Sequence, residues 1–238
     1  MATAVVKAVL FDLDGTLLDT APDMAAALNA MRTADGLEAL PFAQLRELVS
    51  HGARALVRFG YPQAPDTQLE ELRARFISFY AERLVVATRP FEGVLEALSR
   101  LEAADLRWGI VTNKPALLTV PLLERLSLHE RPSVVVSGDT LTERKPHPAQ
   151  LLHAAALLEV PPTECIYIGD AERDVLAARA ANMDVFVALY GYIPAQEKPR
   201  SWPAHGWLDT PQALARLLDT LCGRSAGRCP DDTGQQQS

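Results

Sequence analysis

Cysteine, positive charge and long apolar runs are all scarce in this chain of 238 residues. The three cysteines, Cys165, Cys222 and Cys229, lack the spacing of metal ligands, and their odd number is typical of proteins from a reducing compartment. Residues 1–7 lack a signal-peptide pattern, and no apolar run approaches the roughly 20 residues of a membrane span. The net charge of −7 argues against nucleic acid and anionic membranes as partners. We therefore expect a cytoplasmic protein. A small anionic substrate remains compatible with its charge, because only the local field of the pocket matters.

The composition and the pattern of apolar residues predict an α/β protein. Apolar residues make up 48% of the chain, enough for one large α/β domain or a domain with an insertion. Short apolar runs alternate with amphipathic stretches, which indicates βαβ crossovers and a parallel sheet covered by helices on both faces. Strands are predicted at residues 5–10, 106–111, 133–136, 164–168 and 185–189, and helices at 94–102, 117–126, 148–158, 172–181 and 211–221.

Residues 22–87 interrupt this alternation with helical patterns and no convincing strand. A first helix is expected to begin near Pro22, and further helices are predicted at 42–49, 53–59 and 66–86. A helical block at this place is typical of a cap inserted after the first strand. We therefore predict a core of residues 1–18 and 88–222 and a cap of residues 19–87. Residues 223–238 contain almost nothing apolar and are predicted to be a disordered tail.

The first predicted strand runs into the segment 11–20, which reads FDLDGTLLDT. Asp12 and Asp14 are spaced i and i+2, which can keep both carboxylates on one side of the chain as it leaves the sheet. Gly15 permits a sharp turn directly after them. Two carboxylates this close repel each other unless a cation or a proton lies between them. The simplest interpretation is a divalent metal site that also carries a nucleophile; the alternative is a solvated turn in which Asp and Gly are common for local reasons.

Further polar residues follow other predicted strands. Thr112 and Asn113 come after an apolar run, Lys145 lies in a turn before a helix, and Asp170 and Asp174 follow the strand at 164–168. Taken singly, Thr112 and Asp170 are also typical helix caps, and a lone lysine is usually solvated. Because the carboxyl ends of parallel strands meet at one edge of a sheet, we expect these residues to lie together with Asp12 and Asp14.

In order and in strand context, these segments resemble the four signatures of the haloacid dehalogenase superfamily, whose members are mostly phosphatases. The matching residues are the segment 11–20, Thr112-Asn113, Lys145-Pro146, and Gly169-Asp170 with Asp174. The resemblance extends over residues 6–221. It implies a Rossmann-like parallel sheet with a small inserted all-helical cap. It also implies hydrolysis of phosphate monoesters through an aspartyl-phosphate, with Mg²⁺ as cofactor.

The resemblance assigns a role to each acidic residue. Asp12 is the expected nucleophile, because a carboxylate is ionised at neutral pH and needs no base. Mg²⁺ prefers hard oxygen ligands, here expected to be Asp12, the backbone carbonyl of Asp14, and Asp170. Asp14 would protonate the leaving alkoxide and then take a proton from the hydrolytic water. Asp174 is expected to contact the residues around the metal rather than the metal itself, and to orient Lys145 or a metal-bound water.

The remaining residues of the constellation serve the phosphoryl group. Lys145 would place a positive charge against its oxygens, and Thr112 and Asn113 would donate hydrogen bonds to them. One departure from the superfamily pattern is Ala171, where relatives often carry a second Asp after Asp170. We expect the metal site to survive, because Asp170 and Asp174 are both present.

The substrate is less well defined than the chemistry. The chain most resembles phosphoglycolate phosphatases, and segments 49–56 and 108–115 also resemble the phosphatases of N-acetylmuramic acid 6-phosphate. Both substrates carry a carboxylate, for which Arg54 in the cap offers a bidentate partner unless it is only a solvated helix residue. A sugar phosphomutase on the same core is a further alternative. A dehalogenase would not need Asp14, and a catalytically dead binding module would be expected to lack at least one of the key residues.

Overall fold

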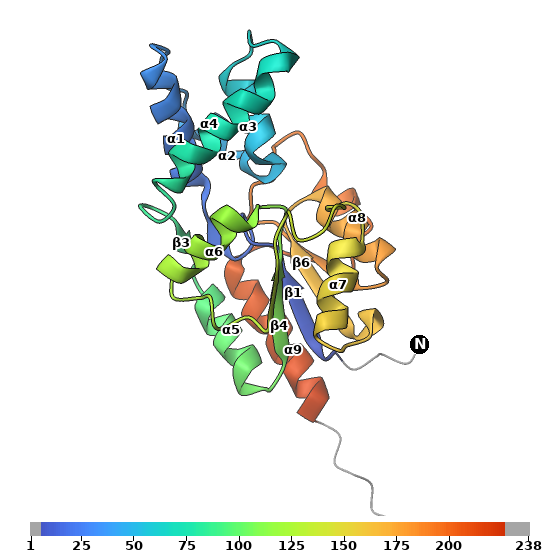
Figure 1. The fold of residues 1–238 in the computed structure, drawn as a ribbon. Helices are drawn as coiled ribbons and strands as arrows, with labels where there is room; N and C mark the ends of the chain where they lie inside the picture. Colours follow the sequence, from blue (N-terminus) through green and yellow to red (C-terminus); the bar gives the residue numbers. More distant parts are fainter. Residues whose placement is uncertain (1–5, 227–238) are drawn as a thin grey trace, which may run out of the picture.

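The fold is an α/β core with a layer of helices above one end of its sheet (Figure 1). The computed structural model describes residues 6–226. The sheet is six-stranded and parallel, in the order β5-β4-β1-β6-β7-β8. Its strands are β1 (Ala8–Phe11), β4 (Arg107–Val111), β5 (Val134–Val136), β6 (Cys165–Gly169), β7 (Asp184–Ala188) and β8 (Gly206–Leu208). The predicted α/β class is therefore confirmed.

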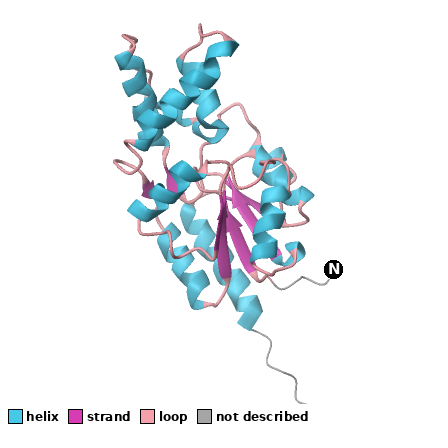
Figure 2. Ribbon diagram, viewed as in Figure 1, coloured by secondary structure: helices cyan, strands magenta, loops and turns pink. Residues whose placement is uncertain are grey.

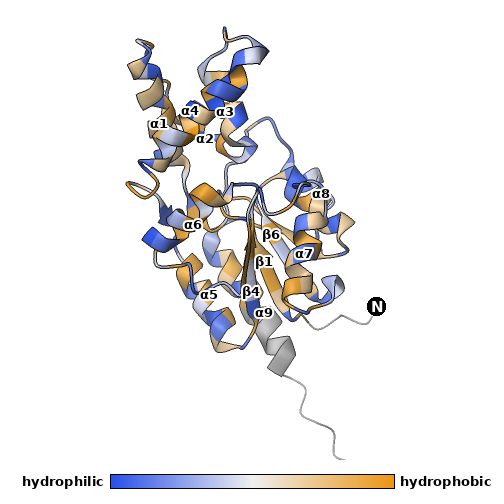
Figure 3. Cartoon of the chain, viewed as in Figure 1, coloured by the Kyte–Doolittle hydropathy of each residue, from blue (hydrophilic) through white to orange (hydrophobic). Residues whose placement is uncertain are grey.

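Helices cover both faces of the sheet, as Figures 1 and 2 show. The helices on one face include α5 (Val94–Ala103) and α9 (Pro211–Ala226), which pack on each other, and α6 (Ala116–Arg125) contributes to the same hydrophobic cluster. The other face is covered by α7 (Ala149–Leu157) and α8 (Glu172–Ala180). Alternate residues of β1 face opposite clusters: Phe11 lies with α5 and α9, and Leu10 with α7 and α8. This burial on both faces explains the apolar run of β1, which is orange in Figure 3.

The cap layer consists of α1 (Ala21–Ala34), α2 (Phe42–Arg46), α3 (Gly52–Gly60) and α4 (Leu69–Ala81). The chain leaves the core through β2 (Leu18–Asp19) and returns through β3 (Arg89–Pro90), and these two strands pair antiparallel. Asp19 is the register partner of Arg89, so the two connections lie side by side. The exact division between core and cap stays a prediction.

Several predicted elements differ from the observed ones. The helix expected at 66–86 is a 3₁₀ turn over Asp66–Gln68 followed by α4, which ends at Ala81. Beyond it, the backbone N–H groups of Val86, Ala87 and Thr88 donate to the buried carboxylate of Asp23. The helix expected at 42–49 gives way to a 3₁₀ turn over Val49–His51. Strands β2, β3 and β8 were not predicted. β2 and β3 have two residues each, and β8 (Gly-Trp-Leu) lacks the β-branched run that identified the equally short β5.

The termini bear on two further expectations. The helix α9 continues through Ala226, four residues into the predicted tail, and the remaining tail residues, together with the first residue of the strand expected at 5–10, lie outside the described part of the chain. Within residues 6–226, no helix combines the length and the apolar character needed to cross a membrane.

Candidate active site

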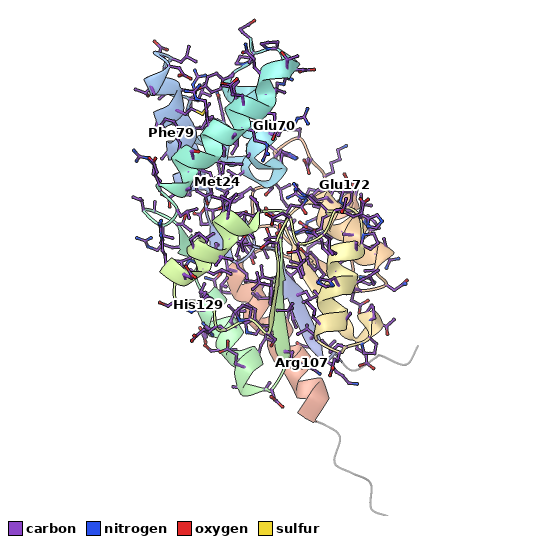
Figure 4. The ribbon with its side chains drawn as sticks, viewed as in Figure 1. Met24, Glu70, Phe79, Arg107, His129 and Glu172 are labelled. Carbon is purple, nitrogen blue, oxygen red and sulfur yellow. The ribbon has the colours of Figure 1, made fainter. Side chains whose placement is uncertain are left out.

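The predicted site residues meet where the carboxyl ends of the strands face the cap. A cavity of about 660 Å³ lies there, lined by core residues that include Asp12 and Thr112 and by cap residues that include Met24 and Glu70. Figure 4 shows Met24 and Glu70 in the helical layer and Glu172 at the facing end of the core, whereas Arg107, which begins β4, lies at the opposite end of the sheet. The cavity therefore occupies the position where open α/β sheets bind ligands.

Asp12, directly after β1, has one carboxylate oxygen held and the other uncommitted. Its backbone N–H donates to Ile168 O at 2.8 Å, which continues the pairing of β1 with β6. The Oδ1 atom accepts the Leu13 N–H at 2.8 Å and lies 2.9 Å from Lys145 Nζ. None of the hydrogen bonds found within residues 6–226 involves Oδ2. Burial raises the pKa of Asp12 and the Lys145 ammonium opposes this effect, so a further cation would favour the ionised form.

Lys145 is the centre of a buried polar network. Its Nζ lies 2.9 Å from Asp12 Oδ1 and 2.8 Å from Asp174 Oδ1. It also donates to Val111 O at 2.9 Å and to Tyr167 OH at 2.7 Å. Asp174 uses its other oxygen to accept the backbone N–H of Ala171 at 3.0 Å. Asp174 thus contacts Lys145 directly. Its predicted role, to orient Lys145 or a metal-bound water, stays a prediction.

Thr112 and Asn113 directly follow β4 and lie beside this network. The Asn113 amide donates to Lys145 O at 3.0 Å and accepts the Lys145 N–H at 3.2 Å, so it fixes the backbone that carries the lysine. The Thr112 hydroxyl accepts the Lys114 N–H at 3.1 Å. Both residues line the cavity, and donation to substrate oxygens stays a prediction for both.

Asp170, after β6, has one satisfied oxygen and one without a partner. Its Oδ2 accepts the Ser50 hydroxyl at 2.6 Å and the Tyr192 N–H at 2.9 Å. Its Oδ1 is buried and has no hydrogen-bond partner among the described residues. Burial, reinforced by Asp12 and Asp174, raises the pKa of Asp170 to about 7. Gly15 is required here, because a Cβ at its position would lie 2.1 Å from Asp170 Oδ2.

These carboxylates fit a divalent cation. Asp12, Asp170 and Asp174 each offer an oxygen within 4.8 Å of those of the other two. Asp174 already has both oxygens engaged, whereas Asp170 Oδ1 is buried and has no partner among the described residues. Hard cations such as Mg²⁺ take such oxygens, and a bound cation would lower the raised pKa values of Asp12 and Asp170.

Asp14 has neighbours that the sequence did not reveal. Its Oδ1 accepts the Thr20 hydroxyl at 2.6 Å and lies 2.9 Å from Lys114 Nζ. Lys114 also donates to Tyr80 OH at 3.1 Å, and Tyr80 belongs to the cap helix α4. The position of Lys114 directly after Thr112-Asn113 was the available signal for the lysine. Its pairing with a residue of the cap depends on tertiary structure.

The remaining cavity wall carries several cations. Arg54, in the first turn of α3, is exposed, lines the cavity and makes no hydrogen bond or ion pair with any described residue. Arg73 of α4 lines the same wall and pairs with Glu70. On the core side lie Arg144 and Arg173, and Arg173 Nε is buried with no partner in the described structure. Neither core arginine was singled out from the sequence, where an isolated arginine gives no pattern.

Comparisons with known proteins agree with this geometry. The family model of the haloacid dehalogenase-like hydrolases matches residues 9–188. The chain is 47% identical over 208 residues to a phosphoglycolate phosphatase of Xanthomonas campestris, covering 87% of this chain and 94% of that protein. It is 42% identical over 218 residues to an N-acetylmuramic acid 6-phosphate phosphatase of Pseudomonas aeruginosa, covering 91% and 96%.

A solved structure supports the same assignment. The crystal structure of a predicted phosphoglycolate phosphatase from Haemophilus somnus superposes with a TM-score of 0.81 at 25% identity, covering 92% of this chain and 99% of that one. The family model alone spans well over half of the residues, and the matched range includes Asp12, Thr112, Lys145 and Asp170. The chain belongs to the haloacid dehalogenase-like hydrolases.

Proposed function

We propose that this protein is a Mg²⁺-dependent phosphomonoesterase that acts through a phosphorylated Asp12. The observation that carries the proposal concerns the carboxylates of Asp12 and Asp170 beside one cavity. In each, one oxygen has hydrogen-bond partners and the other has none among the described residues. Asp12 Oδ2 is available to attack phosphorus, and Asp170 Oδ1 is available to a cation. When bound, Mg²⁺ would be held by Asp12, Asp170 and the backbone carbonyl of Asp14, and would neutralise charge on the substrate phosphate.

The chain's own residues supply the other parts of a phosphoryl transfer. Asp12 Oδ2 attacks phosphorus while Lys145, held by Asp174 and Val111 O, keeps a positive charge beside Asp12. Asp14 gives a proton to the leaving oxygen as the ester bond breaks. It then takes a proton from the water that releases phosphate from Asp12, as general acid–base catalysis requires. The cap excludes bulk water from the cavity during these steps.

The likeness to two kinds of phosphatase leaves two candidate substrates, 2-phosphoglycolate and N-acetylmuramic acid 6-phosphate. The resemblance of the sequence ranks phosphoglycolate first. The cavity favours the larger molecule, because about 660 Å³ is in the range of pockets that enclose whole drug-sized ligands and far exceeds a two-carbon acid phosphate. The cap already contacts the core through Ser50 and Asp170, so this volume does not require an open cap.

A phosphate-release screen tests the proposal directly. We would measure kcat/KM for 2-phosphoglycolate, N-acetylmuramic acid 6-phosphate and a sugar 1-phosphate in the presence of Mg²⁺. The size argument predicts a higher kcat/KM for N-acetylmuramic acid 6-phosphate than for 2-phosphoglycolate, and the reverse order would contradict it. Conversion of the sugar 1-phosphate without release of phosphate would indicate a phosphomutase instead.

A further inference from the structure

One lysine connects the cap to the residue proposed as the acid. Lys114 is 7% exposed and follows Thr112 and Asn113 at the end of β4. Its Nζ lies 2.9 Å from Asp14 Oδ1 and 3.1 Å from Tyr80 OH, and 4.6 Å from the centroid of the Tyr80 ring. Tyr80 is fully buried on α4 and packs against Phe76 of the same helix. A single ammonium group therefore contacts both the core carboxylate and the cap.

The contact of Lys114 with Asp14 and Tyr80, here called the bridge, is shielded from water, because Lys114 and Tyr80 are both buried. Lys114 Nζ contacts a carboxylate oxygen on one side and a hydroxyl on the other, so the bridge is a charge-assisted hydrogen-bond network.

The two carboxylate oxygens of Asp14 also differ in their hydrogen-bond partners. Oδ1 accepts from Lys114 and from the Thr20 hydroxyl at 2.6 Å. Among the described residues, no hydrogen bond engages Oδ2, and Asp14 lines the cavity. With Oδ1 held by two donors, Oδ2 is the oxygen that remains for the substrate.

We propose that Lys114 is a positioning residue, which holds the Asp14 carboxyl group in the orientation needed for proton transfer. Lys114 has this role when the cap lies on the core and Tyr80 contacts its ammonium group. The inference rests on the proposed function, because it takes Asp14 as the acid. Asp14 enters the step protonated on Oδ2, with Oδ1 accepting from Lys114 and Thr20. The proton moves from Oδ2 to the leaving oxygen as the phosphorus–oxygen ester bond breaks and the bond from phosphorus to Asp12 Oδ2 forms. Tyr80 of the cap holds the ammonium group beside Asp14, so a seated cap supports the orientation of the acid during proton transfer.

Leaving groups of different basicity separate this role from a purely structural one. An alkoxide needs a proton as it departs, and general acid catalysis of this kind contributes roughly 10²–10⁴-fold. The 4-nitrophenolate anion departs without one. We would compare kcat/KM, which reports the steps up to the first irreversible one, for an alkyl phosphate and for 4-nitrophenyl phosphate in the Lys114→Met variant. We expect at least about a 10-fold larger loss for the alkyl ester, a part of the full acid contribution.

Two further variants make the result decisive. Asp14→Asn should show the same selective loss of kcat/KM for the alkyl ester. The variant that carries both Lys114→Met and Asp14→Asn should lose no more than Asp14→Asn alone, because Lys114 acts through Asp14. Arg46→Met is the matched control: Arg46 also joins the cap to the core, with its guanidinium 4.9 Å from the Tyr192 ring centroid, but it has no contact with Asp14. We expect Arg46→Met to affect both esters equally.

Each outcome has one meaning. Equal losses for both esters in Lys114→Met, beside a selective loss in Asp14→Asn, would overturn the role of Lys114 and leave the proposed function intact. Equal losses in Asp14→Asn would refute Asp14 as the acid and the inference with it. If Lys114→Met does not fold, Tyr80→Phe, which removes only the hydroxyl, takes its place. A selective loss of about threefold supports the bridge, and an unselective effect overturns it.

Discussion

Asp12, Asp14 and Asp170 share one arrangement at the scale of single residues: protein donors hold one carboxylate oxygen of each, and the other has no protein partner in the described structure. The held oxygen fixes the orientation of the side chain. In the proposed function, the remaining oxygen serves as the nucleophile in Asp12, as the proton carrier in Asp14 and as a cation ligand in Asp170. Preorganisation of this kind needs no rearrangement at the moment of reaction.

The nucleophile is tested by Asp12→Asn. The amide has nearly the shape of the carboxylate but lacks the charged oxygen that attacks phosphorus, so we expect turnover to fall below detection with folding retained. Phosphate release and the thermal unfolding midpoint would be measured together. Sustained formation of phosphate by the Asn variant would remove Asp12 from this role.

The selectivity of the cap is tested by Arg54→Ala. If Arg54 binds the substrate carboxylate, the loss in kcat/KM should be about 2 kcal/mol, or roughly 30-fold, the scale of a charged hydrogen bond. The loss should nearly vanish for 4-nitrophenyl phosphate, which has no carboxylate. Arg58→Ala, on the same helix but paired with Asp66, is the control and should change neither value appreciably. Equal losses on both substrates for Arg54→Ala would mean that Arg54 supports the cap rather than selecting the substrate.

At the scale of elements, the connection between core and cap is organised by one buried carboxylate. Asp23, in the first turn of α1, accepts hydrogen bonds from the backbone N–H groups of Val86, Ala87 and Thr88 and from the Thr88 hydroxyl. It thereby fixes the segment that leads from α4 to β3 against the helix that follows β2. Tyr192 fixes the other connection, through the Asp19 carboxylate at 2.7 Å and the Ala21 N–H at 3.0 Å.

Asp23→Ala should therefore destabilise the protein markedly. The substitution leaves partly or fully buried N–H groups without an acceptor, and each such group costs about 1–3 kcal/mol. We expect a drop of several degrees in the unfolding midpoint and faster proteolysis within residues 82–88. Asp66→Ala removes an exposed carboxylate of the same layer and serves as the comparison, with little expected change. A midpoint of Asp23→Ala that matched the one for Asp66→Ala would refute the role of Asp23.

The elements and site residues that were predictable from the sequence share a local signal. Asp12, Thr112 and Asp170 each follow an apolar run directly, so a single parallel sheet is enough to bring them together. The bridge from Lys114 to Tyr80 and the length of α4 were not predictable in this way. They depend on contacts between segments far apart in the chain, and a local pattern carries no information about such contacts.

At the scale of the whole molecule, buried negative charge is concentrated at one point. Burial raises the pKa of both Asp12 and Asp170, in the second case to about 7. The folded protein without a cation thus binds protons more tightly than the unfolded chain, in which an aspartate titrates near 3.9. This stabilising contribution is present at low pH and is lost as the pH rises through about 7.

A divalent cation should reverse this loss. We expect Mg²⁺ to raise the unfolding midpoint of the chelator-treated protein more at pH 8 than at pH 5.5, because the Asp170 carboxylate, with its pKa raised to about 7, is ionised mainly at the higher pH. Differential scanning fluorimetry at both pH values would measure the effect without any substrate. Asp170→Asn should abolish most of the response to Mg²⁺. An equal shift at both pH values, or full activity in excess chelator, would argue against the metal site.

The antiparallel pairing of β2 with β3 has a consequence for how such a protein can diversify. Asp19 and Arg89 are register partners, so the chain enters and leaves the helical layer at two neighbouring positions. Insertions succeed where chain ends lie close together at a surface, because the host sheet keeps its register whatever is inserted. Recombination at these two points can therefore exchange one helical module for another and alter which molecules are admitted. The reactive carboxylates, which belong to the sheet, remain where they are.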